Sequence, residues 1–426
     1  MNQFCLEPIV ITGVGVLACN GIGRKAFWNA LENGRSGIGM IDRFDTEKFP
    51  CKIGGQLWDF DPRDFLNKGT IKRWHRAVHQ SVAATRLALD DASFDTPGYA
   101  PERVAVGIGT SVGSPDETYE GYREVCESRG WEFVDKLAST ANSGHASTAN
   151  VSSNFGFRGP AITIASGCST GLDMLTWGKE QIRIGNADAA VVGASETPLT
   201  EWAFAGTCAL GILTERNEPP EKAMRPFDRD SDGLVLSEGS VVLVLERADR
   251  AKARGAHIFG EVAGTGSAAE GHNPLILERD GSALARAIGA SLEEAGIAPE
   301  DVDCAHCHGV GLSNYDRCEV SGYKAALGSH AYRIPISATK SMIGQAYSAG
   351  GLLSVAGALM SLESGLMPPT INLETPALEC DLDFVPNSPR WNDPENALVT
   401  ALSFGGTHSA VLLRRYGEEK RNGRGN

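Results

Sequence analysis

The feature that most constrains the fold of this sequence is a regular alternation of short β-branched runs with longer segments of helical periodicity. Alternation of this kind predicts an α/β protein in which helices cover both faces of a sheet. The predicted strands are Ile9–Thr12, Val104–Ile108, Ile162–Ile164, Ala189–Val192, Val241–Leu245, Ile258–Val262, Ile334–Ile336, Leu398–Ala401 and Ala410–Leu413. The predicted helices are Arg24–Glu32, Lys72–Asp91, Thr170–Ile184, Ala248–Ala253, Ser282–Glu294, Tyr315–Ala326 and Leu352–Leu362.

The length of 426 residues exceeds what one simple core needs and indicates two fused units or a large duplicated fold. Similar strand and helix rhythms occur on either side of Gly260, although we find no clean residue-level repeat. We therefore predict an N-terminal half over residues 1–260, a C-terminal half over 261–416 and a polar tail over 417–426.

Charge and hydropathy argue against several classes of function. The formal net charge of −14 disfavours nucleic acid as a partner, because the phosphate backbone is also negative. The sequence contains no run of about 18 apolar residues, so it predicts no membrane span. No Lys or Arg precedes Arg24, whereas an export signal needs a basic start. We expect a cytoplasmic protein whose ten cysteines are thiols.

Two motifs match cofactor patterns but are better explained by structural roles. The run from Gly13 to Ala18 fits a dinucleotide-binding pattern, but no acidic residue ends a second strand about 20 positions later, so we interpret it as a tight turn. The run from Cys304 to His308 has the spacing of haem attachment, which requires export, and zinc would need a second ligand pair. We interpret this run as a strand with His306 and His308 on one face, and we predict no metal site.

Cys168 is the strongest candidate for a nucleophile. The segment 159–171 reads as a strand, a sharp turn and a helix, with small residues around the cysteine that leave room for a substrate. A helix beginning near Ser169 would direct its first amides and its dipole toward the sulfur and favour the reactive thiolate. The local pattern leaves a buried structural cysteine open as the alternative.

Ordered motifs along the chain carry a resemblance to a known family. They are Ile11-Thr12-Gly13-Val14-Gly15, Gly159-Pro160, Ala165 to Gly171, Arg225-Pro226-Phe227-Asp228, Asp232-Gly233 to Glu238-Gly239, His308-Gly309, Ser337-Ala338-Thr339-Lys340-Ser341, Pro368-Pro369-Thr370-Ile371-Asn372-Leu373 and Ser403 to Thr407. From about Pro8 to Arg415 the chain resembles the β-ketoacyl-acyl-carrier-protein synthases, especially the elongating synthases of fatty acid and type II polyketide systems.

The resemblance implies a thiolase-like fold, which is a duplicated five-layer α/β/α/β/α arrangement and is normally dimeric. It also implies decarboxylative condensation by a ping-pong route. An acyl carrier protein delivers an acyl group to the cysteine, and malonyl carried on the same kind of protein then loses carbon dioxide and attacks the thioester. No cofactor is implied, because the substrates are carried on the phosphopantetheine of the acyl carrier protein. The partner subunit is either a second copy of the chain or a related ketosynthase-like chain.

The resemblance assigns roles to five residues. Cys168 matches the family nucleophile, and its backbone amide and that of Phe404 match the oxyanion hole. His308 matches a histidine whose neutral imidazole donates to the malonyl thioester oxygen. Lys340 and Glu319 match a neighbouring lysine and acid that order the site, the acid keeping the buried lysine charged.

Further positions concern substrates. Phe404 matches an aromatic gate next to the acyl pocket, and Val112 matches a wall residue that limits chain length, so medium or long acyl chains are expected. For docking of the carrier protein we predict the basic cluster of Lys72, Arg73 and Arg76, for which a solvated helix face is the alternative.

The sequence departs from the family pattern at the second active-site histidine, where Gln345 stands. A glutamine amide donates hydrogen bonds but does not titrate near neutral pH. Because holding an enolate oxygen needs only a donor, we expect decarboxylation to survive at a reduced rate.

Other departures lie in the loops that surround the malonyl substrate. Val310 and Leu312 replace two threonines whose hydroxyls hold phosphopantetheine, so two hydrogen bonds to the carrier arm are expected to be missing. The gate segment, Ala401 to His408, surrounds Phe404. In it Ser403 and His408 replace the commoner glycine and asparagine, and Ser403 should make the segment stiffer. These changes favour a specialised polyketide, polyene or unusual-lipid pathway over general fatty acid synthesis.

Two alternatives share the same resemblance. A chain-length-factor-like subunit would shape a partner's pocket without catalysis, but such subunits usually lack the cysteine that this chain has at Cys168. An acyltransferase would load Cys168 and pass the acyl chain to a nucleophile other than malonyl. A thiolase fits less well, because the segment 403–408 lacks the second reactive cysteine of that class.

Overall fold

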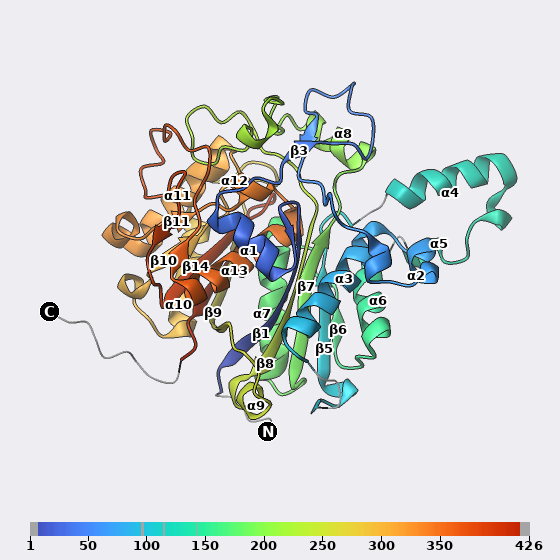
Figure 1. The fold of residues 1–426 in the computed structure, drawn as a ribbon. Helices are drawn as coiled ribbons and strands as arrows, with labels where there is room; N and C mark the ends of the chain where they lie inside the picture. Colours follow the sequence, from blue (N-terminus) through green and yellow to red (C-terminus); the bar gives the residue numbers. More distant parts are fainter. Residues whose placement is uncertain (1–6, 95–97, 114–115, 142, 418–426) are drawn as a thin grey trace.

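The computed structural model describes residues 7–94, 98–113, 116–141 and 143–417, and its main feature is one continuous mixed β-sheet between layers of helices (Figure 1). The strand order is β11-β10-β14-β15-β9-β1-β8-β7-β5-β6, and β2 pairs beside β1. The predicted tail over 417–426 lies outside the described residues except for its first residue.

The strands of this sheet have the following bounds: β1 Ile9–Ala18, β2 Gly21–Ile22, β5 Val104–Gly109, β6 Ala161–Ile162, β7 Ala189–Glu196, β8 Gly239–Arg247, β9 Gly260–Ala269, β10 Cys304–His306, β11 Ile336–Ser337, β14 Asn396–Leu402 and β15 Thr407–Arg414. Two small ribbons are formed by β3 Gly39–Met40 with β4 Ile53–Gly54, and by β12 Leu366–Met367 with β13 Arg390–Trp391.

The sheet is built from two halves of identical topology. In the first half β1 is antiparallel to β8, β8 is antiparallel to β7, and β7, β5 and β6 are parallel. In the second half β9 is antiparallel to β15, β15 is antiparallel to β14, and β14, β10 and β11 are parallel. The halves join where β1 pairs with β9. The sequence rhythms therefore reflect a duplication of topology.

The helices make three layers around the two half-sheets. The helices have these bounds: α1 Arg24–Glu32, α2 Lys68–Arg73, α3 Arg76–Asp91, α4 Asp116–Arg129, α5 Ala138–Ala141, α6 Ala146–Phe155, α7 Thr170–Arg183, α8 Glu201–Ala209, α9 Ala248–Ala253, α10 Ser282–Ala295, α11 Ser313–Leu327, α12 Lys340–Ile343 and α13 Tyr347–Ser364. α3 and α6 cover the first half-sheet, α10 and α11 cover the second, and α7 and α13 lie between them (Figure 1). This is the predicted five-layer arrangement.

The central helix α13 shows why the middle layer is buried. Its residues from Ser348 to Leu362 are apolar or small on every side, and all of them are buried. A helix without a polar face can lie only in a core. No helix in the described part of the chain is long and apolar enough to cross a membrane. By contrast, α4 extends away from the body of the molecule (Figure 1).

Glycines in β1 and β9 explain how closely the outer helices approach the sheet. A Cβ on Gly15 would lie 1.9 Å from the carbonyl oxygen of Ala84 in α3, and one on Gly266 would lie 2.0 Å from that of Ala287 in α10. Gly13 and Gly264 show the same close approach in their halves. The expected tight turn over residues 13–18 is therefore wrong, since β1 runs through it. The Gly-x-Gly pattern instead allows α3 to pack closely on β1, and the same pattern allows α10 to pack closely on β9.

One predicted helix is also wrong in part. The sequence predicted a single helix from Lys72 to Asp91, whereas α2 ends at Arg73 and α3 begins at Arg76. Trp74 and His75 have extended backbone angles, so they separate the two helices. The prediction relied on hydrophobic periodicity, which gives no signal of this break.

We predict that Gly15→Ala and Gly266→Ala each lower the free energy of unfolding by about 2–3 kcal/mol, because the added methyl group meets a helix carbonyl. The matched control is Gly289→Ala in α10, an exposed glycine with no atom within 4 Å of the added Cβ, where alanine should be neutral or stabilising. Thermal unfolding at fixed protein concentration measures the difference. Equal stability of all three variants would contradict this packing role.

Candidate active site

The ends of equivalent strands in the two half-sheets meet around one buried point. The loop after β6 leads to Cys168, and the loop after β11 leads to Lys340. His308 follows β10, and Phe404 follows β14. Functional groups commonly gather at the carboxyl ends of parallel strands. The duplication thus brings residues from both halves of the chain together.

Cys168 lies in a short 3-10 turn, Gly167–Ser169, that leads directly into α7. Gly167 has a φ of +66°, which few other residues adopt, and it allows the sharp turn between strand and helix. The predicted strand, turn and helix are therefore present. Only 4% of Cys168 is exposed, so a substrate must reach it through a confined space.

The side-chain amide of Gln345 donates a hydrogen bond to the Cys168 sulfur, with Nε2 and Sγ 3.3 Å apart. Gln345 is held by its backbone, which donates to the carbonyl of Val235 at 2.8 Å and accepts from the amide of Ser237 at 3.0 Å. Its Oε1 has no hydrogen-bond partner among the described residues, and Gly350 leaves the room that this oxygen needs. A glutamine placed in this way offers a fixed donor beside the nucleophile.

The ionisation of Cys168 differs from the prediction. Burial raises the pKa of the thiol to about 12, and Glu196 acts in the same direction, whereas Lys340 and the Gln345 hydrogen bond lower it. Desolvation thus exceeds the effect of the favourable partners. The resting site holds a thiol where the sequence predicted a thiolate, so the proton must leave as the sulfur attacks.

His308 is held through its backbone by acidic side chains of α11. Glu319 accepts from the amides of His308 at 2.6 Å and Gly309 at 2.8 Å, and Asp316 accepts from the next two amides at 3.1 and 3.2 Å. Burial, followed by the charge of Lys340, lowers the pKa of His308 well below its usual value. The imidazole is therefore neutral, as the sequence predicted, and its Nδ1 has no hydrogen-bond partner in the described part of the chain.

The predicted ion pair between Lys340 and Glu319 is not formed. The Glu319 carboxylate is occupied by the two loop amides and by the hydroxyl of Thr400 at 2.7 Å. Lys340 is fully buried, and its Nζ has no hydrogen-bond partner among the described residues. Burial lowers the pKa of Lys340, whereas the negative charge of Glu319 and nearby thiols raises it. Backbone amides outcompete the lysine because they are fixed closer to the carboxylate.

Hydrogen bonds from Ser403 hold the gate segment against the turn Gly167–Ser169, which we call the nucleophile turn. The Ser403 hydroxyl oxygen accepts from the amide of Ser169 at 2.7 Å and donates to the carbonyl of Ser166 at 2.8 Å. The next residue, Phe404, packs edge-on against Tyr315 with ring centroids 5.4 Å apart. Glycine at position 403 would lack both hydrogen bonds, which supports the expectation of a stiffer gate.

Glu196 is a buried residue of the site that sequence reasoning missed. It ends β7 and accepts from the backbone amides of Ser111, Val112 and Gly113 at 2.8–2.9 Å. It also accepts from the hydroxyl of Ser348 in α13 at 2.7 Å. This carboxylate fixes the loop after β5. The only signal in the sequence was an acid at the end of an otherwise apolar strand.

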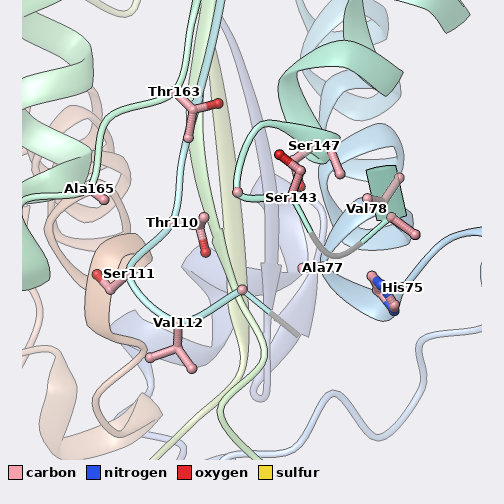
Figure 2. Close-up of a pocket in the computed structure, with 14 residues that line it drawn as sticks. His75, Ala77, Val78, Thr110, Ser111, Val112, Ser143, Ser147, Thr163 and Ala165 are labelled. Carbon is pink, nitrogen blue, oxygen red and sulfur yellow. The ribbon is translucent and has the colours of Figure 1, made fainter. Parts of the chain in front are cut away.

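A cavity of about 220 Å³ lies beside the nucleophile turn and is bounded by the loop after β5 (Figure 2). Val112 contributes to its lining, as the predicted wall role requires. The remaining lining is mixed: alanine, valine and glycine residues alternate with the polar residues His75, Thr110, Ser111, Ser143, Ser147 and Thr163. In Figure 2 Ser111 points away from Thr110, and its hydroxyl donates to the carbonyl of Gly167 at 2.8 Å. The cavity and the nucleophile turn therefore adjoin.

The structure separates the three residues of the predicted docking cluster. Lys72 and Arg73 are exposed at the end of α2. Arg76 instead makes two hydrogen bonds to the buried Glu238, at 2.7 and 2.9 Å, and only 13% of its side chain is exposed. Including Arg76 in a docking surface is therefore wrong, since it compensates an internal charge.

His306 packs within the core, and the described cysteines form no disulfides. His306 Nε2 lies 3.2 Å from the hydroxyl oxygen of Ser361 in α13, and burial lowers the pKa of the imidazole to about 3. The haem-like run is thus part of a core strand, β10. All nine cysteines within the described residues are free thiols, in agreement with the sequence prediction.

Comparisons with known proteins define the family. The model of the β-ketoacyl synthase N-terminal domain matches residues 6–251, and the model of its C-terminal domain matches residues 259–374. The chain is 37% identical over 421 residues to the tetracenomycin polyketide synthase ketoacyl synthase alpha subunit of Streptomyces glaucescens, covering 97% of this chain and 99% of that protein. The chain belongs to the β-ketoacyl synthase family, whose members are acyl-transferring condensing enzymes.

Other relatives extend the comparison to fatty acid synthesis and to solved structures. The chain is 33% identical over 410 residues to 3-oxoacyl-acyl-carrier-protein synthase 2 of Synechocystis sp., covering 96% of this chain and 98% of that protein. A type II polyketide synthase acyl-carrier protein in complex with its ketosynthase matches with a TM-score of 0.89 and 30% identity, covering 96% of this chain and 100% of that one. The ishigamide ketosynthase/chain length factor matches with a TM-score of 0.90 and 29% identity, covering the same shares.

We predict that Val112→Phe shortens the acyl chain that can be loaded, because the larger side chain fills the cavity beside the loop after β5. Loading of medium and long acyl groups should fall about tenfold or more, while acetyl loading stays unchanged and serves as the internal control. Intact-mass spectrometry across a series of acyl-carrier-protein substrates measures the profile. The same chain-length profile in both proteins would rule out the wall role.

Proposed function

We propose that this chain catalyses decarboxylative condensation of an acyl group on Cys168 with malonyl carried on an acyl carrier protein. The observation that carries the proposal is the hydrogen bond from Gln345 to the Cys168 sulfur, in the same buried site as the neutral His308. Thioester exchange requires a nucleophile such as the Cys168 sulfur. Enolate stabilisation requires hydrogen-bond donors, which the neutral imidazole of His308 and the amide of Gln345 can supply.

In the first half-reaction the Cys168 sulfur attacks the acyl thioester and expels the phosphopantetheine thiol. The thiol proton of Cys168 ends on the departing sulfur, so no external acid is consumed. The amides of Cys168 and Phe404 are the proposed oxyanion hole for the tetrahedral intermediate. Movement of Phe404 away from Tyr315 would admit the acyl group.

In the second half-reaction malonyl loses carbon dioxide and becomes an enolate thioester. Neutral His308 and the Gln345 amide hold the enolate oxygen, while the positive charge of Lys340 stabilises the developing negative charge. The enolate carbon attacks the acyl carbonyl, and Cys168 leaves as a thiolate that takes up one proton. The product is a 3-ketoacyl group on the carrier protein.

The departures from the family pattern support a specialised substrate. Gln345, Val310 and Leu312 stand where the resemblance implies a histidine and two threonines. The cavity lining does not itself select an acyl chain, because the hydroxyls of Thr110, Ser143 and Thr163 already have hydrogen-bond partners within the protein. We place the enzyme in a polyketide, polyene or unusual-lipid pathway in the reducing cytoplasm, with a second ketosynthase-like subunit or a second copy as partner. A chain-length-factor-like role without catalysis has less support, because Cys168 is present and has a donor beside it.

We predict that Cys168→Ala abolishes acyl loading, whereas Cys126→Ala, which removes a half-buried cysteine of α4, leaves it unchanged. Purified protein is incubated with acyl-carrier-protein, its intact mass is measured, and malonyl-carrier-protein is then added. An adduct followed by 3-ketoacyl product supports the synthase. An adduct without product supports acyl transfer to another nucleophile, and no adduct with either candidate partner supports the non-catalytic role.

We predict that Gln345→Met, which keeps the size but removes the donor, lowers the condensation rate about a hundredfold. Acyl loading should slow less, because this change removes only one of the interactions that lower the pKa of Cys168. Gln345→His should restore a donor and recover condensation. Single-turnover measurements separate the two half-reactions, and an unchanged condensation rate in Gln345→Met would refute the role of the amide.

We predict that Lys72→Glu combined with Arg73→Glu weakens binding of the acyl carrier protein about five- to tenfold at low salt and less at high salt, because the docking is electrostatic. Arg333→Glu reverses an exposed cation in the other half of the chain and serves as the control. Binding is measured by calorimetry at two ionic strengths. Equal affinities for the variants would remove α2 from the docking surface.

A further inference from the structure

Three side chains with metal-ligating atoms meet beside the gate segment. Glu270 follows β9, Cys318 lies in α11, and His408 is the second residue of β15. Their oxygen, sulfur and ring nitrogen atoms all lie within 4.8 Å of one another. None of the three has a role in the proposed condensation, so their convergence needs a separate explanation.

The cluster is closed to solvent, and one of its ring nitrogens has no hydrogen-bond partner among the described residues. The side chains of His408 and Glu270 are 0% and 1% exposed, and Cys318 is a fully buried free thiol. His408 Nε2 lies 2.8 Å from Glu270 Oε1, whereas His408 Nδ1 has no hydrogen-bond partner within the described residues. A buried ring nitrogen without a partner is costly unless a ligand compensates it.

The electrostatic surroundings favour a cation. Glu270 brings a buried carboxylate into the cluster, and its Oε2 accepts from the amide of Glu278 at 3.0 Å. The guanidinium of Arg286 donates to the carbonyl of Ala269 at 2.9 Å. Buried charges are normally paired or bound to a metal ion, so the Glu270 carboxylate favours a cation at its side.

We propose that Glu270, Cys318 and His408 bind a divalent transition-metal ion of the zinc class. A thiolate, an imidazole and a carboxylate are the donors that Zn²⁺ takes, with a fourth position open to water. Tetrahedral geometry at typical zinc bond lengths puts ligand atoms about 3.3–3.6 Å apart, so small side-chain rotations complete the site. The zinc–sulfur bond replaces the S–H bond, and the proton passes to solvent.

A metal ion at this position would tie three elements together. The amide of Glu270 already donates to the carbonyl of Gly406 at 2.8 Å, two residues after Phe404. Cys318 lies one helical turn after Tyr315, the residue against which Phe404 packs. Metal binding would therefore restrain the gate, a consequence that rests on the proposed function, whereas the binding itself does not.

The test measures zinc binding directly, in the full chain carrying Cys168→Ala so that the catalytic thiol cannot contribute. Metal-free protein is titrated with Zn²⁺ in competition with a chromophoric chelator, and the bound ion is examined by X-ray absorption. We expect one equivalent with one sulfur ligand. Adding Cys318→Ser or His408→Asn should weaken binding about a hundredfold or more, whereas adding Cys380→Ser, another buried cysteine, should not.

Glu270→Gln keeps the shape of the cluster, so this variant should fold even if the other substitutions disrupt the structure. Circular dichroism checks the fold of every variant. Glu270→Gln should weaken zinc binding about tenfold with the fold intact. Two results would overturn the proposal: no bound zinc in the parent protein, or one equivalent retained with the same affinity after Cys318→Ser and His408→Asn. Because none of these readouts requires turnover, a failure of the condensing activity would leave the outcome interpretable.

Discussion

Burial of the point where loops from the two half-sheets meet is the constraint on which the rest of the site depends. Cys168, His308, Gln345, Lys340 and Glu319 are each at most 4% exposed. Desolvation disfavours the charged form of the four titratable groups among them, so the thiol keeps its proton and the imidazole is neutral. Fixed donors such as the Gln345 amide gain strength in the same environment, because little water competes with them.

The duplicated topology explains how so many polar groups share one buried point. The loops after β5 and β10 occupy equivalent positions, as do those after β6 and β11 and those after β7 and β14. Each loop is fixed by a partner from elsewhere: Glu196 holds the loop after β5, and Glu319 holds the loop after β10. Buried carboxylates that accept several amide hydrogen bonds stabilise these loops without needing a cation.

The departures from the family pattern concern how the site is controlled. Gln345 stands in place of a titratable histidine, so the donor that we propose holds the enolate does not change its charge with pH. Ser403 links the gate to the nucleophile turn, and His408 meets Glu270 at the far end of the same segment. The gate is thus tied at both ends in this chain.

Much of the fold followed from the sequence, which also supplied the candidates for the main site residues. Strand and helix periodicity predicted the α/β class, and the motif around Cys168 predicted the strand, turn and helix, because both signals are local. The resemblance to the β-ketoacyl synthases implied that His308, Lys340 and Gln345 belong to one site. The glycine pattern in β1 was visible, but its meaning as helix packing required the partner helix to be in place.

Tertiary structure alone decided which groups are partners and what their charge states are. Nothing near Glu319 in the sequence shows that backbone amides would take its carboxylate instead of Lys340, and nothing near Arg76 shows that Glu238 would neutralise it. The convergence of Glu270, Cys318 and His408 was equally invisible, because the three lie in separate elements. Hydrogen bonding and desolvation depend on distances in space, and those are set by packing between the two halves of the chain.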